Sequence, residues 1–109
     1  MGLELVHQGH LTLPQMVHKM SHAPALLFGI QERGFLREGY WADMILVDPN
    51  PAMPISRDQV LYKCGWSPLE GDILQHSVVK SFVNGELKYD QGRFMGAPNG
   101  QRLAFNALK

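Results

Sequence analysis

The sequence predicts an α+β fold: a helical segment followed by a small, mainly antiparallel β segment. Three observations lead to this prediction. The first thirty residues place apolar side chains at helical spacing, whereas from Gly34 onward glycines divide the chain into short pieces. Among those pieces, Asn84-Gly85 is the preferred dipeptide of a two-residue hairpin turn. We expect three parts, a helical segment over residues 1–32, a β-rich segment over 33–95 and a loosely ordered tail over 96–109.

The helical segment is expected to contain a pair of helices. The first ends near Val6 and is stopped by Gly9. The second begins at Thr12-Leu13-Pro14-Gln15, a capping box in which the Thr hydroxyl and the Gln amide each satisfy a free backbone amide. Pro24 should end this helix or start another, because the residue before a proline is pushed out of the α region, and Gly29 should close the last turn. Four residues at a spacing of three to four form one apolar stripe: Leu13, Met16, Val17 and Met20.

The β-rich segment begins with Met44–Val47, four apolar residues in a row. Because no polar residue alternates with them, we expect a strand with both faces covered. The prolines of Asp48-Pro49-Asn50-Pro51 end this strand, since they cannot donate to a sheet ladder. Ser56–Gln59 resembles a second capping box and predicts a short helical turn. The hairpin strands are expected at Val78–Val83 and Glu86–Tyr89.

Composition and charge narrow the classes of partner. Ten basic and ten acidic residues give a net charge of zero with no run of one sign, so neither nucleic-acid nor membrane-surface binding has electrostatic support. No apolar run approaches the ~18 residues of a membrane span, and the N-terminus has no signal-peptide pattern. Cys64 is the only cysteine, which excludes an intrachain disulfide and fits a cytoplasmic protein in a reducing compartment.

Four stretches together resemble the amidohydrolase superfamily. Ser21–Ile30 and Arg33–Asp48 are similar to the place where the last barrel helices of that superfamily lead into a small β-sandwich. Leu61-Tyr62-Lys63-Cys64-Gly65-Trp66-Ser67-Pro68-Leu69-Glu70-Gly71 and Phe82–Leu87 narrow the resemblance to the dihydroorotase branch, the cyclic amidohydrolases. The resemblance extends from about Leu3 to about Phe94.

The resemblance implies a structural role within a larger enzyme. The segment would supply the last barrel helices and most strands of the accessory sandwich, while the family's catalytic residues lie upstream. The whole enzyme would be zinc-dependent and would interconvert dihydroorotate and N-carbamoyl-aspartate in pyrimidine biosynthesis. The chain is too short for a (β/α)8 barrel, which needs ~250 residues. Dihydropyrimidinase, allantoinase and a stand-alone interaction module are the alternatives. We also expect self-association through the apolar stripe and through the open edge beside Met44–Val47.

The histidines do not reproduce the family's metal site. By resemblance the ligands are a His-x-His pair, a carboxylated lysine, two further histidines and an aspartate, and none maps onto this chain. Ser21-His22-Ala23-Pro24 echoes part of the family's Asp-His-Ala-Pro-His motif, but Ser stands for the Asp and Ala25 for the second His. A zinc-helix motif would need a glutamate where Lys19 stands, and a third ligand. Surface or capping roles are expected for all five histidines: His7, His10, His18, His22 and His76.

The remaining reactive groups favour structural roles. Cys64 is expected to be a packed, inert thiol in a crowded apolar turn. Ser67 lacks the Gly-x-Ser-x-Gly context of a nucleophile elbow. The turn carboxylates Glu70, Asp72 and Asp90 should cap backbone amides. The two tryptophans, Trp41 and Trp66, should be core or interface anchors. No catalytic, cofactor-binding or metal-ligating residue is expected in this segment, and zinc is implied only for the parent enzyme.

Overall fold

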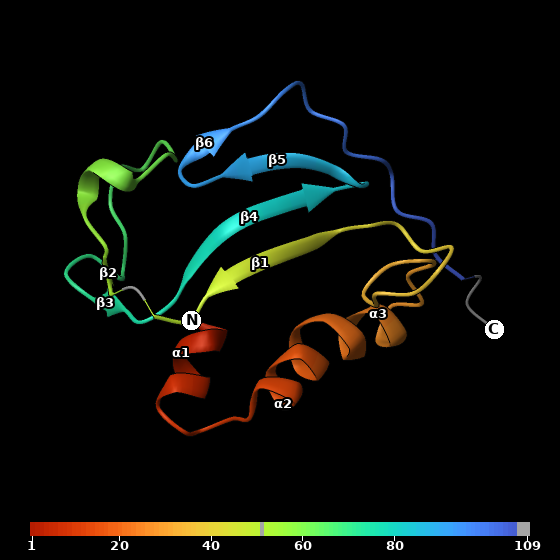
Figure 1. Ribbon diagram of the computed structural model, residues 1–109, viewed down its shortest axis with the longest axis horizontal. Helices are drawn as coiled ribbons and strands as arrows, with labels where there is room; N and C mark the ends of the chain where they lie inside the picture. The colour runs from red at the N-terminus through yellow and green to blue at the C-terminus, as the bar shows by residue number, and fades with distance from the viewer. Residues whose placement is uncertain (51, 107–109) are drawn as a thin grey trace.

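The computed structural model describes residues 1–50 and 52–106, arranged as a helical layer and an antiparallel sheet (Figure 1). The helical layer comprises α1 (Gly2–His7), α2 (Leu13–Val17), a π-helical turn (His18–His22) and α3 (Ala23–Leu27). The strands are β1 (Met44–Asp48), β2 (Met53–Pro54), β3 (Ile73–Leu74), β4 (Ser77–Val83), β5 (Glu86–Asp90) and β6 (Arg93–Phe94), and a 3₁₀ helix spans Arg57–Gln59. The predicted α+β class is therefore confirmed.

The helix ends follow the local chemistry that the sequence predicts. At the start of α2, the Thr12 backbone amide donates to Gln15 Oε1 at 2.9 Å, and the Gln15 backbone amide donates to Thr12 Oγ1 at 3.3 Å. At the end of α3, Gly29 takes a positive φ of 63°, and the Ile30 amide donates to the Ala25 carbonyl at 2.8 Å. That bond is the long bond of a Schellman motif, which satisfies the last free carbonyls of a helix.

Pro24 does not interrupt the helix. Ala23, the residue before the proline, keeps φ −62° and ψ −43°, so the prediction that this residue leaves the α region was wrong. The Ala23 amide donates to the His18 carbonyl five residues back, which widens the turn just before the proline. Pro24 has no amide hydrogen to donate and its ring would crowd a regular preceding turn. The π-helical turn makes room for the ring, and α2 and α3 form one rod.

The four-stranded sheet has the order β1-β4-β5-β6, with every pairing antiparallel. Asn84 and Gly85 have φ values of 50° and 81°, as a type I′ turn requires, which confirms the predicted hairpin. A bulge separates Leu46 from Val47 where β1 pairs with β4. Strands β2 and β3 form a separate two-stranded sheet, and neither these two strands nor β6 was predicted.

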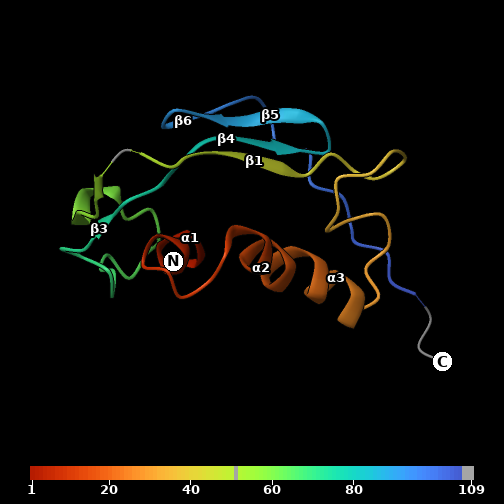
Figure 2. The same ribbon diagram turned by 60° about the horizontal axis from the view of Figure 1, so that its bottom comes forward.

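The helices lie on one side of the sheet without closing a core (Figure 2). Ala25 is the only described residue that counts as buried, at 5% exposure. The accessible surface is 8500 Å², against about 6,100 Å² for a typical folded monomer of this mass. The radius of gyration is 15.8 Å, against about 13 Å for a compact domain of this length. The described chain is therefore an open two-layer structure.

This openness corrects the expectation for β1 and one of the two alternatives for the tryptophans. Both faces of β1 were expected to be covered, yet Ile45 is 57% exposed and Leu46 is 50% exposed. Trp41 and Trp66 are also exposed, so neither is a core residue of the described chain, and the alternative role of an interface anchor stays a prediction. Covering both faces of β1, or burying the tryptophans in a core, would require packing neighbours that these residues do not have within the described chain.

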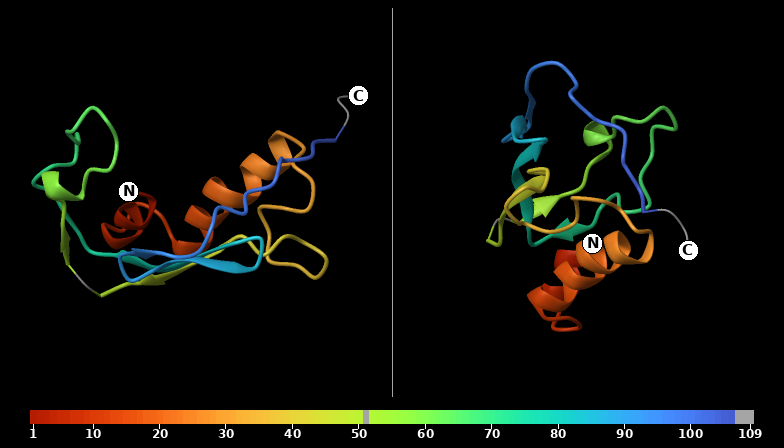
Figure 3. Two further views of the ribbon diagram at one scale, coloured as in Figure 1. Left: turned by 90° about the horizontal axis from the view of Figure 1, so that it is seen from above. Right: turned by 90° about the vertical axis from the view of Figure 1, so that its right-hand side faces the viewer.

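Residues 96–106 run from the sheet back to the end of α3 (Figure 3). The Gln31 amide donates to the Ala104 carbonyl at 2.9 Å, and the Asn106 amide donates to the Gly29 carbonyl at 2.8 Å. Ile30 and Phe105 form an isolated antiparallel bridge between these bonds. The described part of the tail is thus tied to the helical segment, which differs from the expected loose tail; residues 107–109 lie outside the described residues.

Candidate functional site

A cluster of hydrogen-bonded polar side chains lies where the connector after α3 meets the β4–β5 turn. The Arg33 guanidinium pairs with the Asp43 carboxylate and donates to Asn84 Oδ1 at 2.9 Å. The other carboxylate oxygen of Asp43 accepts a hydrogen bond from the Asn84 backbone amide at 2.8 Å. The Arg33 side chain is only 11% exposed, and its guanidinium lies 5.0 Å from the centre of the Trp41 ring. These charged hydrogen bonds fix the connector to the hairpin.

Asn99 extends this cluster to the tail. The Asn99 backbone carbonyl accepts a hydrogen bond from the Asn84 side-chain amide at 2.6 Å. The Asn99 side-chain amide donates to the Val83 backbone carbonyl at 2.9 Å. Four residues from three distant parts of the chain are thereby linked, and we call them the hairpin clamp: Arg33, Asp43, Asn84 and Asn99. Most of their polar groups bond to one another, an arrangement that holds loops in place, while the Asn99 side-chain oxygen is buried without a hydrogen-bond partner among the described residues.

The histidines lie in two pairs. The His18 and His22 rings are 6.1 Å apart and perpendicular, and His22 stacks on Phe35 at 4.3 Å. His22 is therefore part of an aromatic stack. His7 and His76 meet edge to face at 5.7 Å, and His76 is half-buried where a surface position was expected.

A carboxylate stands beside the second histidine pair. Glu4 accepts the Gln75 amide at 3.1 Å. That backbone hydrogen bond is the main reason why the pKa of Glu4 lies below its ordinary value, with smaller contributions from Gln8 and the two histidines. The bond joins α1 to the loop that leads into β4.

The donor groups of the described chain do not fit a zinc site. Nowhere in residues 1–50 and 52–106 do three or more His, Cys, Asp or Glu side chains gather in a way that could hold a metal ion. The helix pair His18 and His22 would supply two of the four ligands of a structural zinc, and His22 is stacked against Phe35.

The other candidate residues are dispersed. Cys64 is exposed, so the expectation of a packed thiol in a crowded turn was wrong. Ser67 accepts the Leu69 amide at 3.2 Å, a local turn contact. Asp90 pairs with the Lys80 ammonium at 2.8 Å across the hairpin, where a turn-capping role was expected. Amide capping by Glu70 and Asp72 stays a prediction.

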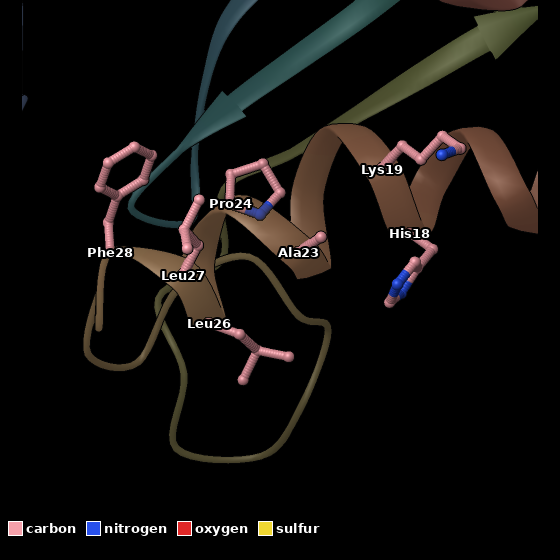
Figure 4. A pocket seen from close by; sticks show the side chains of 7 residues that line it. All are labelled: His18, Lys19, Ala23, Pro24, Leu26, Leu27 and Phe28. Carbon is pink, nitrogen blue, oxygen red and sulfur yellow. The ribbon is translucent and has the colours of Figure 1, made fainter.

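Two hollows mark the apolar surface. One, of about 720 Å³, lies between the rod and the sheet and is lined by Val17, Ser21 and His22 on one side and by Ile45, Phe82 and Val83 on the other. The second, of about 480 Å³, lies at the end of the rod, where Pro24, Leu26, Leu27 and Phe28 line it beside His18 (Figure 4). Leu26, Leu27 and Phe28 are all strongly exposed. Such apolar surfaces are typical of contacts with another protein segment.

Among the described residues, none of the helices has the length and apolar content needed to cross a membrane. No protein-family model matches the chain. The sequence is 34% identical over 101 residues to a dihydroorotase of Pyrococcus furiosus, a match that covers 93% of this chain and 24% of that protein. It is 31% identical over 100 residues to an allantoinase of Escherichia coli, covering 90% of this chain and 22% of that protein.

A solved structure has the same fold over most of the chain. The L-hydantoinase (dihydropyrimidinase) of Arthrobacter aurescens aligns with a TM-score of 0.78 and 28% identity, covering 86% of this chain and 21% of that one. The chain thus spans about a quarter of the length of the relatives it matches. It belongs to the amidohydrolase superfamily, in which it corresponds to a C-terminal segment of the cyclic amidohydrolases.

Proposed function

We propose that this chain is the C-terminal, non-catalytic part of a dihydroorotase. The observation that carries the proposal is the match to dihydroorotases over 93% of the chain at 34% identity. In this proposal the rod of α2 and α3 covers the side of the catalytic barrel. The four-stranded sheet forms most of the accessory sandwich. The lone Cys64 supports a reducing, cytoplasmic setting.

The hairpin clamp supports a scaffolding role. It ties the connector, the hairpin turn and the tail together with groups that are largely engaged with one another. The exposed apolar residues at the end of the rod have the character of a surface that another part of an enzyme covers. Zinc and the attacking hydroxide would be held by residues of the parent enzyme outside this segment.

The first test is an assay of the chain alone. With dihydroorotate and added zinc, turnover should not exceed that of a buffer control. Metal analysis after dialysis should give well below one equivalent of zinc. Turnover that is lost on chelation, or one tightly held zinc abolished by His18→Ala, would refute the non-catalytic assignment.

A second test addresses the parent activity. The matching C-terminal segment of the Pyrococcus furiosus dihydroorotase is replaced by this chain, and the same exchange is made in the Escherichia coli allantoinase. The dihydroorotase chimera should fold and retain activity to a greater degree than the allantoinase chimera. The opposite order would favour an allantoinase parent, to which the 31% identity gives specific support.

A further inference from the structure

The hairpin clamp contains both Asn-Gly dipeptides of the chain, Asn84-Gly85 and Asn99-Gly100. An asparagine followed by glycine is prone to spontaneous deamidation, because glycine has no side chain to hinder the reaction. The glycine nitrogen attacks the side-chain carbonyl carbon of the asparagine and forms a C–N bond that closes a succinimide ring, while the side-chain nitrogen leaves as ammonia. Water then opens the ring to give aspartate or isoaspartate.

At Asn84 both reacting groups are held by hydrogen bonds. The nucleophile, the Gly85 nitrogen, donates to the Ala42 carbonyl at 3.0 Å. The Asn84 side-chain oxygen accepts from Arg33 at 2.9 Å, and the side-chain nitrogen donates to the Asn99 carbonyl at 2.6 Å. Asn84 also has a φ of 50° within the hairpin turn. Attack at this site therefore requires the release of several hydrogen bonds at once.

At Asn99 the same groups are held by fewer contacts. The side-chain nitrogen donates to the Val83 carbonyl at 2.9 Å, and the side-chain oxygen has no hydrogen-bond partner among the described residues. The Gly100 nitrogen has no backbone acceptor within the described part of the chain. Gly100 is exposed, and no described atom lies within 4 Å of an added Cβ. Only one side-chain hydrogen bond has to break before attack at Asn99.

We propose that Asn99 is a deamidation site of this chain and that the hairpin clamp protects Asn84, although glycine follows both residues. The arrangement of the bonds also sets an order of reaction. Because the Asn99 carbonyl holds the Asn84 side chain, a change at Asn99 removes part of the protection of Asn84. This inference goes beyond the proposed function, because it concerns a covalent change of the chain itself.

Each product of the first reaction disturbs the clamp in its own way. The aspartate product has no side-chain donor for the Val83 carbonyl, and its carboxylate would lie against that carbonyl oxygen without a compensating donor. The isoaspartate product adds a methylene group to the main chain and displaces the carbonyl that holds Asn84. Deamidation at Asn84 should therefore follow deamidation at Asn99.

The test is a time course of the 109-residue chain in mildly alkaline buffer, in which the glycine nitrogen loses its proton more readily. Peptide mapping by mass spectrometry follows each side-chain amide as it becomes a carboxylate. In native buffer, Asn99 should convert at least ~10-fold faster than Asn84, because fewer hydrogen bonds must break. In urea the clamp is lost, and the two rates should become similar because glycine follows both residues.

Two variants separate the sites. Asn99→Asp imitates the first product and should raise the rate at Asn84 at least ~5-fold in native buffer, measured on protein that keeps the circular dichroism of the unaltered chain. Gly100→Ala is the matched control, because its methyl group hinders attack on Asn99 and meets no described atom within 4 Å. It should slow conversion at Asn99 at least ~10-fold and leave the rate at Asn84 unchanged.

Equal rates at the two asparagines in native buffer would overturn the proposal, whether both are slow or both match their rates in urea. A faster reaction at Asn84 would also overturn it. An unchanged rate at Asn84 in folded Asn99→Asp contradicts the order of reaction. If that variant does not fold, the comparison of native buffer with urea on the unaltered chain still decides the proposal. The chimera assay does not depend on these rates.

Discussion

The two ends of the four-stranded sheet are organised in opposite ways. At the β4–β5 turn, the hairpin clamp joins segments that are far apart in sequence. At the other end the chain leaves the sheet as an arm, residues 53–74, that contains β2, the 3₁₀ helix and β3 (Figure 1). The hydrogen bonds of the arm lie mainly within it, as between Ile55 and Asp72 and between Arg57 and Gly65.

Exposure follows the same division. The Arg33 side chain of the clamp is nearly buried, whereas Leu61, Tyr62 and Trp66 of the arm are exposed. The clamped end is thus held by its own chain, and the arm has local order with little packing. Changes at the clamped end should therefore lower the stability of the whole unit, and changes in the arm should stay local.

Gly34→Ala should have the largest effect. An added Cβ would overlap the Ala25 methyl, lie 2.9 Å from the Ser21 carbonyl and sit at a φ of +81°. Overpacking and left-handed strain together should lower the free energy of unfolding by about 3 kcal/mol, measured by urea denaturation at fixed protein concentration. Gly39→Ala is the control, because Gly39 has a φ of +80° and no described atom within 4 Å of an added Cβ. It should cost about 1 kcal/mol, and equal losses at both positions would contradict the contact with Ala25.

Asp43→Ala should rank second, because it removes the anionic partner of the nearly buried Arg33 guanidinium and the acceptor of the Asn84 backbone amide. A loss of about 2 kcal/mol in unfolding free energy is expected from the same denaturation measurement. The control is Glu86→Ala, which removes the exposed partner of Lys88 at 2.7 Å on the same sheet. Glu86→Ala should lower the free energy of unfolding far less, since exposed ion pairs contribute little to stability. A larger effect of Glu86→Ala would show that the clamp does not stabilise this end.

A matched pair of glutamines compares the rod with the arm. Gln15 Oε1 accepts the Thr12 amide at the start of α2, and Gln59 Oε1 accepts the Ser56 amide at 3.3 Å in the arm. Either change to Ala should cost about 0.5–1 kcal/mol locally. Gln15→Ala should speed amide hydrogen exchange throughout the helical layer. Gln59→Ala should be visible only within residues 53–74, and faster exchange in β4 and β5 would mean that the arm supports the sheet.

The smallest expected effect is a dependence on acid at Glu4. Its pKa is lowered in the folded chain, so its contribution to stability is fully present above the ordinary value of 4.5 and is lost as the pH falls through the lowered folded value. Exchange of the Gln75 amide should therefore accelerate below pH 4.5 beyond its intrinsic pH dependence. Glu4→Gln should remove this acceleration. An unchanged profile in that variant would assign the effect to another group.

Local chemistry explains which parts of the fold could be predicted. The Thr12 capping box, the glycines that close α1 and α3, and the Asn84-Gly85 turn each depend on residues a few positions apart. The strands β2, β3 and β6 have two residues each, too few to show any periodicity. The bridge between Ile30 and Phe105 depends on a contact between distant residues that no local pattern signals.

The candidate site was harder to predict for the same reason. Of the four clamp residues, the sequence predicts a local role for Asn84 alone, as a turn residue, and includes Arg33 and Asp43 only within the stretch Arg33–Asp48. Its partners Arg33 and Asn99 lie in segments distant from it in sequence. The exposure of Cys64 and Ile45 could not be predicted for a second reason. Whether a side chain is buried depends on the segments that pack against it in space as well as on its neighbours in sequence.

The π-helical turn sets a phase difference between the two halves of the rod. Each residue advances about 100° around an α-helix, and this turn holds one residue more than a regular turn. Side chains after His22 are therefore rotated by roughly that angle relative to those before it. Met16 and Met20 approach Gly2 of α1, while Leu26 and Phe28 line the hollow at the far end. A deletion of one residue in this turn could preserve a helix throughout and still aim every apolar side chain of α3 in the wrong direction.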